Sequence, residues 1–314
     1  MAWREALFLT NDDGIDAPGL HYLISQLHAL GHPLAVLAPA SQQSASGMRL
    51  TLHSELKFEN RSDLIEKLEL DPDGAPVRIY SLDGTPCDCV VIAMDGGFEK
   101  WAPEIRPRMC ISGINRGPNV SVDIMHSGTV SAAREAALYG MPSMALSLAT
   151  YLHEDYTVGF QSGLKMIRSC LNHMSQEPPN KNRPRGSQHM PWISESLSMP
   201  EKVKEAFLCG DLFLNVNFPH EWTGKIETVG LGARWYLGAA TATNKDDGSI
   251  EFEVGAASIQ DEEIPDTDCL SIMVGSVAIT PLATWPQTHP LNVPNQILRT
   301  ALQTNDEGYP AWLD

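Results

Sequence analysis

Basic side chains are scarce in this sequence. Its 22 Lys and Arg residues stand against 39 Asp and Glu residues, which gives a formal net charge of −17 at pH 7. Because such a chain is repelled by polyanions, broad contact with nucleic acid or with an anionic membrane is disfavoured unless basic residues cluster locally. The sequence contains no such cluster. We therefore expect neither a nucleic-acid duplex nor a membrane among its partners.

Long hydrophobic runs are also absent. No stretch reaches the roughly 18 apolar residues of a membrane span, and the short apolar run near the N-terminus is interrupted by charge and lacks a small-residue cleavage site. The expectation is a soluble, cytoplasmic protein. Hydrophobic residues nevertheless fill 43% of the 314 positions, which is enough for a substantial core without disulfides.

Cysteines are few and scattered, and a single close pair, Cys87 and Cys89, stands out among the six. This usage is typical of cytosolic proteins. A structural zinc site would need further Cys or His ligands at suitable spacing, and no second pair completes the set. In a strand, "CDC" (87–89) would place both thiols on one face, and "DCVVIAM" (88–94) is expected to be a strand, so we expect buried thiols there rather than zinc.

A dinucleotide-binding glycine fingerprint is missing after the first predicted strand, which argues against a Rossmann cofactor. The apolar periodicity itself alternates between strand and helix, as in α/β proteins with a mostly parallel sheet. The ligand site of such a sheet lies outside the carboxyl ends of its strands. The predicted elements are strands at 6–10, 33–39, 88–94, 108–115 and 143–150, and helices at 17–30 and 128–140.

The second half of the chain is less regular. Residues 176–200 are rich in proline and polar residues and predict a long loop insertion. After a strand ending in "LNVNFP", a "KDDG" turn between two β-rich runs predicts a long hairpin over 225–255. A protruding hairpin arm usually needs a partner surface. A strand at 276–282 and a helix at 289–302 follow.

We accordingly divide the chain into two parts. Residues 1–222 are expected to form an α/β catalytic core that includes the insertion. Residues 223–314 are expected to supply the extended hairpin, a returning strand and a C-terminal helix, which complete the core and form an oligomer interface. No internal repeat is present.

Two adjacent carboxylates, Asp12 and Asp13 in "TNDDGID", follow the first predicted strand. Such residues suit an ordinary turn or helix cap. They also suit a divalent cation, which removes their mutual repulsion. Polar loops after two other strands offer further oxygen atoms, including Ser44 in "QSASG" and Asn115 in "SGIN". Turn chemistry explains each loop singly, but all three are predicted at the ligand-binding edge of the sheet.

The segment "HSGTVSAAREAALYG" also predicts an anion-binding site. Ser127, Gly128 and Thr129 begin the predicted helix, where unpaired N–H groups and the helix dipole favour an anion. Simple capping by Ser or Thr accounts for the segment equally well. A cation and an anion-binding helix end in one cleft together describe metal-assisted hydrolysis of a phosphate ester.

Several blocks of the sequence, in this order, resemble the SurE family of survival-protein nucleotide phosphatases. The match covers most of residues 5–151 and patches between 211 and 282. The blocks are "LFLTNDDGIDAPGL", "APASQQSASGMRLT", "GTPCDCV", "SGINRGPNV", "HSGTVSAAREAALYGMPSMALS", "LNVNFP" and "TDCLSIMVGSVAITPL".

The resemblance implies a three-layer α/β/α fold and a 5'-nucleotidase that hydrolyses nucleoside 5'- and possibly 3'-monophosphates with one Mg²⁺ or Mn²⁺ ion. It further implies a homodimer or homotetramer assembled through the arm. The family's functional positions carry over as follows: metal ligands Asp12, Asp13, Ser44 and Asn115; phosphate-binding residues Asn11, Asn119, Ser127, Gly128 and Thr129; and catalytic residues Asp12, Asn115 and Ser127.

One departure from the family pattern is His126, which replaces the usual Tyr before "SGT". A substituted packing residue or a proton donor to the leaving alcohol would each account for it. Three other functions compete with hydrolysis: a non-catalytic sensor of metal and nucleotide, a nucleotide-sugar transferase, and a phosphatase with an aspartyl-phosphate intermediate. The sequence lacks the Asp-x-Asp spacing expected of a nucleotide-sugar transferase. A phosphatase with an aspartyl-phosphate intermediate needs a separate nucleophile and acid, which the adjacent Asp12 and Asp13 do not supply.

Overall fold

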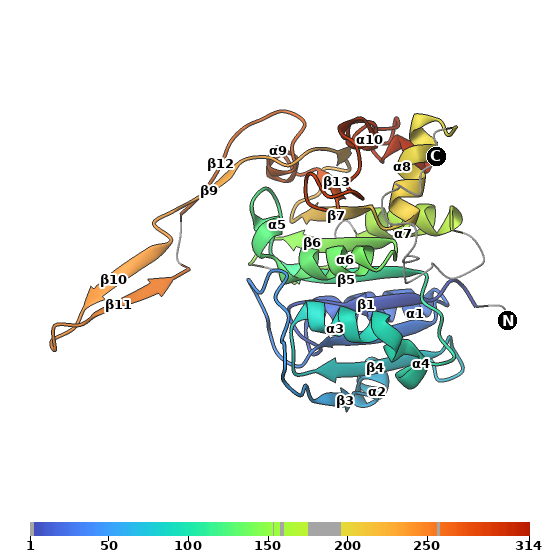
Figure 1. Ribbon diagram of the computed structural model, residues 1–314, viewed down its shortest axis with the longest axis horizontal. Helices are drawn as coiled ribbons and strands as arrows, with labels where there is room; N and C mark the ends of the chain where they lie inside the picture. The colour runs from blue at the N-terminus through green and yellow to red at the C-terminus, as the bar shows by residue number, and fades with distance from the viewer. Residues whose placement is uncertain (1–2, 153, 158–159, 175–195, 256–257) are drawn as a thin grey trace.

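The computed structural model describes residues 3–152, 154–157, 160–174, 196–255 and 258–314 (Figure 1). Its centre is a nine-stranded sheet. The strands are β1 (Leu7–Thr10), β2 (Leu34–Pro39), β3 (Phe58–Asn60), β4 (Val77–Leu82), β5 (Met109–Arg116), β6 (Ser143–Ala149), β7 (Leu212–Pro219), β8 (Ile226–Thr228) and β13 (Val277–Ala283).

The strand order across the sheet is β3-β4-β2-β1-β5-β6-β7-β13-β8. The six strands from β4 to β7 run parallel to one another, whereas β3 and β13 are antiparallel to β4 and β7. The predicted α/β class with a mostly parallel sheet is therefore confirmed. The antiparallel strands lie towards the two ends of the sheet.

Helices cover both faces of the sheet, which gives three layers. Leu7 and Leu9 of β1 pack into one hydrophobic core, and Phe8 between them packs into the other, because successive side chains of a strand point to opposite faces. The helices are α1 (Pro18–Ala29), α2 (Asp63–Lys67), α3 (Pro86–Ile92), α4 (Phe98–Trp101), α5 (Asp123–His126), α6 (Gly128–Leu138), α7 (Phe160–Asn172), α8 (Met199–Leu208), α9 (Asp268–Met273) and α10 (Asn295–Ala301).

The predicted strand at 88–94 is wrong, because most of this segment belongs to α3. Pro86 occupies the first turn, and Thr85 caps the helix by accepting a hydrogen bond from the backbone N–H of Asp88, whose side chain bonds back to Thr85. This reciprocal capping box overrides the β-branched residues that suggested a strand. The thiols of Cys87 and Cys89 are buried, as expected, but in a helix.

The hairpin predicted around the "KDDG" turn is confirmed. Strands β10 (Ala240–Asn244) and β11 (Ile250–Val254) pair antiparallel across it. A second antiparallel pair, β9 (Arg234–Leu237) and β12 (Ser258–Asp261), forms the base. Together they make an arm that extends away from the body of the molecule at the left of Figure 1.

Most of the predicted insertion, residues 176–195, lies outside the described residues. Its last residues form the start of α8, where Ser198 caps the helix. The predicted returning strand and C-terminal helix correspond to β13 and α10. Within the part of the chain that the structure describes, no helix combines the length and the apolar character needed to cross a membrane.

Candidate active site at the carboxyl edge of the sheet

The three polar loops predicted to converge do meet at one edge. Strand β1 lies between β2 and β5 and is parallel to both, so the loops after these strands leave the sheet side by side. The backbone N–H of Gln43, after β2, donates to the carbonyl of Asp12 at 2.7 Å. The backbone N–H of Arg116, at the end of β5, donates to Asp13 Oδ2 at 3.0 Å. Both aspartates are thus held by neighbouring loops.

Asp12 is buried against the first turn of α6. The hydroxyl of Thr129 donates a hydrogen bond to Asp12 Oδ1. A Cβ placed on Gly128 would lie 2.7 Å from Asp12 Cβ and 2.6 Å from Ser46 Oγ, so these residues meet only because position 128 is glycine. Burial raises the pKa of Asp12 to about 6, and repulsion by Asp13 contributes to the shift. The raised pKa indicates that the positive charge around the Asp12 carboxylate, at the N-terminus of α6, does not offset these two effects.

Asp13 is half-buried beside Asp12. Burial raises its pKa above the ordinary value, although hydrogen bonds from the backbone of Arg116 and the side chain of Gln42 oppose the rise. Two neighbouring carboxylates whose pKa values are both raised form a site that a cation would stabilise.

The other two predicted metal ligands lie on the flanking loops. Asn115, near the end of β5, is half-buried, and its Nδ2 donates to the carbonyl of Gly117 at 2.9 Å, an arrangement that directs the amide nitrogen to the backbone. Ser44 is exposed on the loop after β2. The two residues before it, Gln42 and Gln43, contact the side chain of Asp13 and the carbonyl of Asp12.

The predicted phosphate-binding segment begins α6, an 11-residue helix. Ser127 is its N-cap, and its Oγ accepts a hydrogen bond from the N–H of Val130 at 3.0 Å. Ser127 therefore caps the helix, and its hydroxyl proton remains available for an anion. The hydroxyl of Thr129 binds Asp12 instead, so in this structure its side chain positions a carboxylate.

Asn119 lies in a buried amide network that connects β5 to β6 and β7. Its Nδ2 donates to Ser147 Oγ at 2.8 Å, and its backbone N–H donates to Asn217 Oδ1 at 2.8 Å. Its carbonyl accepts from Asn215 Nδ2 and Asn217 Nδ2 at 2.7 and 3.0 Å. The backbone of Asn119, which follows β5, is thus held by side chains of β7, the second strand along in the sheet.

The chemistry of the donor set fits a hard divalent cation. Two buried oxygens beside the aspartates, Asn11 Oδ1 and Ser46 Oγ, have no hydrogen-bond partner. Among the described residues, no three His, Cys, Asp or Glu side chains gather into a metal cluster. A cation here would accordingly rest on two carboxylates and neutral amide or hydroxyl oxygens, a combination suited to Mg²⁺ or Mn²⁺ and unsuited to zinc.

His126 ends α5, immediately before Ser127. Its side chain is exposed, so it does not pack into the hydrophobic core of this chain. Its carbonyl accepts a hydrogen bond from the N–H of Gly47 at 2.8 Å, which joins α5 to the loop after β2.

Three residues of the site were not predicted from the sequence: Ser147, Asn215 and Asn217. One signal was present in "LNVNFP", where two Asn residues alternate with apolar residues in an otherwise apolar strand. Side chains two apart in a strand share a face. The alternation therefore marks a polar stripe on a buried strand, which requires partners.

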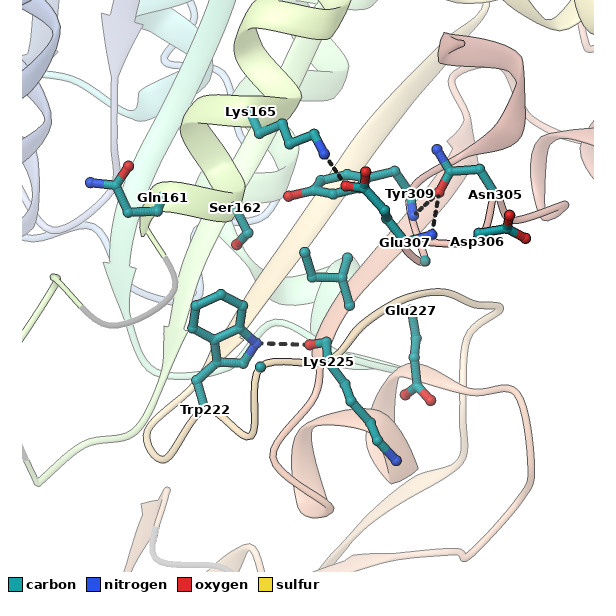
Figure 2. Close-up of a pocket in the computed structure, with 13 residues that line it drawn as sticks. Gln161, Ser162, Lys165, Trp222, Lys225, Glu227, Asn305, Asp306, Glu307 and Tyr309 are labelled. Carbon is teal, nitrogen blue, oxygen red and sulfur yellow. Dashed lines mark hydrogen bonds and ion pairs between the residues drawn. The ribbon is translucent and has the colours of Figure 1, made fainter.

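A cavity of about 680 Å³ lies elsewhere, and no predicted site residue lines it. It is bounded by the start of α7, the turn before β8 and the segment 305–309 (Figure 2). Lys165 in its wall is paired with Glu307, and its ammonium lies 4.7 Å from the centre of the Tyr309 ring. The charge of this lysine is therefore already engaged by neighbouring side chains.

Comparison with known proteins identifies relatives of this chain. A 5'-nucleotidase SurE from Syntrophotalea carbinolica is 31% identical over 281 residues, which cover 88% of this chain and 90% of the relative. A 5'-nucleotidase SurE from Caldanaerobacter subterraneus is 32% identical over 282 residues, covering 89% and 91%. The crystal structure of the SurE protein from Aquifex aeolicus superimposes with a TM-score of 0.62 at 26% identity, covering 90% of this chain and 95% of that one. The family described as "Survival protein SurE" matches residues 7–236. This chain belongs to the SurE family.

Proposed function

We propose that this protein is a metal-dependent 5'-nucleotidase, a phosphomonoesterase that releases phosphate from nucleoside 5'-monophosphates. The observation that carries the proposal is the contact of buried Asp12 with the first turn of α6. This contact brings a paired-carboxylate site and an anion-ready helix end into one place. The relatives named 5'-nucleotidase SurE support the same activity.

Asp12, Asp13, Ser44 and Asn115 would hold the metal ion. When bound, a divalent cation there would polarise the phosphoryl oxygen and offset the negative charge of the ester. The protein itself positions the two carboxylates. Thr129 fixes the carboxylate of Asp12, and the backbone of Arg116 fixes that of Asp13.

The first turn of α6 would bind the phosphate. Ser127 Oγ can donate its proton to a phosphoryl oxygen while it still accepts from Val130. The helix dipole favours the anion at the same position. Asn119, whose backbone is fixed by Asn217, would orient the ester from the side of β5.

Phosphate release from AMP, measured with added Mg²⁺ or Mn²⁺ and again with excess EDTA, tests the proposal. We expect turnover only with metal, and a loss of about 100-fold or more in kcat/KM for Asp13→Asn. Asp16→Asn is the matched control, because Asp16 lies in the same loop but is exposed and paired with Arg61. Equal activity of Asp13→Asn and wild type would defeat the proposal. Binding of AMP and metal without any phosphate release would favour the rival sensor function.

We further propose that two or four copies assemble through the arm. In β11, Ile250, Phe252 and Val254 are exposed and point to one face. Their cross-strand partners include Ala240 and Ala242, while Thr and Glu residues occupy the opposite face. An apolar face on a protruding hairpin is typical of an interface.

The remaining expectation concerns location. Five of the six cysteines, Cys87, Cys89, Cys110, Cys170 and Cys269, are buried thiols outside any disulfide. This is consistent with a protein of the reducing cytoplasm, which is the location we propose.

A further inference from the structure

Tyr151 lies at the same edge of the sheet as the proposed active site. It follows β6, the neighbour of β5, and is separated from the end of that strand by one residue. The guanidinium of Arg116 donates from Nη2 to the carbonyl of Tyr151 at 2.8 Å. The backbone N–H of the same arginine holds Asp13. One residue thus ties the backbone of Tyr151 and the carboxylate of Asp13 together.

The ring of Tyr151 rests on the backbone of Gly117. A Cβ built on Gly117 would lie 2.3 Å from Cε1 and 2.7 Å from Cζ of the ring, so only glycine leaves room for it. The carbonyl of Gly117 accepts a hydrogen bond from Asn115 Nδ2. The ring therefore lies against the residue whose carbonyl holds the side chain of Asn115, one of the proposed metal ligands.

Much of this ring faces solvent, since Tyr151 is 56% exposed. Partial burial raises its pKa above the ordinary value, and the charge of Asp123 raises it further. The phenol therefore stays neutral at neutral pH. A neutral, exposed aromatic ring at the edge of the sheet that carries the proposed active site is suited to stacking against another flat ring.

We propose that Tyr151 determines substrate binding by stacking against the base of the nucleoside monophosphate, with the phosphate at the start of α6. This inference rests on the proposed function and adds the residue that recognises the nucleoside. Every base has a π-face, so stacking on one ring tolerates different bases. Purine and pyrimidine monophosphates are both expected as substrates.

The test compares AMP with ribose 5-phosphate, which carries the same phosphate ester and lacks the base. For Tyr151→Ala we expect KM for AMP to rise about 5- to 160-fold, which corresponds to the roughly 1–3 kcal/mol lost with one base–aromatic stack. KM for ribose 5-phosphate should not change, and Tyr151→Phe should match wild type on both substrates. Leu152→Ala is the control for disturbance of the loop, because Leu152 is 84% exposed and carries no ring.

Three results would overturn the inference: an unchanged KM for AMP in Tyr151→Ala, an equal rise for both substrates, or the same effect in Leu152→Ala. Calorimetric titration of AMP and ribose 5-phosphate into wild type and Tyr151→Ala, with Mg²⁺ present, separates this inference from the function on which it rests. If the protein bound AMP through Tyr151 but released no phosphate, the proposed function would be wrong and the stacking role of Tyr151 would stand. Equal AMP binding by the two proteins would overturn that role.

Discussion

At residue 128 the site depends on the absence of a side chain. Gly128 begins α6, and an added Cβ would approach Ser46 Oγ to 2.6 Å and Asp12 Cβ to 2.7 Å. We expect Gly128→Ala to push Asp12 away from the helix and to lower kcat/KM for AMP by about 100-fold, because small displacements of catalytic groups are costly. Steady-state kinetics measures this loss.

Gly163→Ala is the matched control for that substitution. Gly163 also lies in a helix, and its added Cβ would lie 2.9 Å from Cζ of Phe218, within the core beside β7. This variant should lower the melting temperature and leave the kinetics of the folded enzyme unchanged. If both glycine variants lost stability and activity in proportion, position 128 would have only a packing role.

At the scale of elements, Asp88 attaches α3 to the loop that carries Ser46. Its carboxylate accepts from the backbone N–H of Thr85 and of Thr51, both at 2.8 Å. Burial raises the pKa of Asp88, but these hydrogen bonds outweigh it and hold the pKa below its ordinary 3.8. A depressed pKa contributes stability that is complete above the ordinary value and is lost as the pH falls through the lower, folded value.

We therefore expect Asp88→Asn to lower the free energy of unfolding by about 1 kcal/mol at pH 7, and by less at pH 3. Urea denaturation at both pH values measures the difference. Asp83→Asn, which alters an exposed carboxylate just before the helix, should have no such effect. A loss of the same size at both pH values would contradict the assignment of this stability to the carboxylate.

The elements also show how far sequence patterns reach. Long apolar runs such as 6–10 and 143–150 predicted their strands correctly, because strands buried on both faces read as continuous hydrophobic segments. Strand β4 was missed, since Arg78 interrupts its apolar pattern. The capping box at Thr85 was a local signal that was overlooked. The clamp of Asn217 on Asn119 joins residues 98 positions apart, and no local pattern encodes the strand order that brings them together.

At the scale of the whole molecule, the base of the arm is fixed to the body beside the proposed site. Arg234 donates to Asp123 Oδ2 at 2.8 Å and to Asp261 at 2.7 Å, and the hydroxyl of Tyr236 donates to Asp123 Oδ1 at 2.5 Å. Asp123 begins α5, the helix that leads into Ser127. The position of the arm is therefore linked to the segment that would bind phosphate, and assembly through the arm would hold that segment in place.

The apolar face of the arm provides the test of assembly. We expect Phe252→Asp to shift the protein from dimer or tetramer to monomer, because a charge on this face must be desolvated when a second copy covers it. Size-exclusion chromatography with light scattering measures the mass. Glu253→Gln is the control, since its side chain lies on the opposite face of the same strand, across from Thr241. A wild-type protein that is already monomeric, or a Phe252→Asp variant that keeps its assembled mass, would show that this face does not join the subunits, and the exposed hairpin would then require another partner.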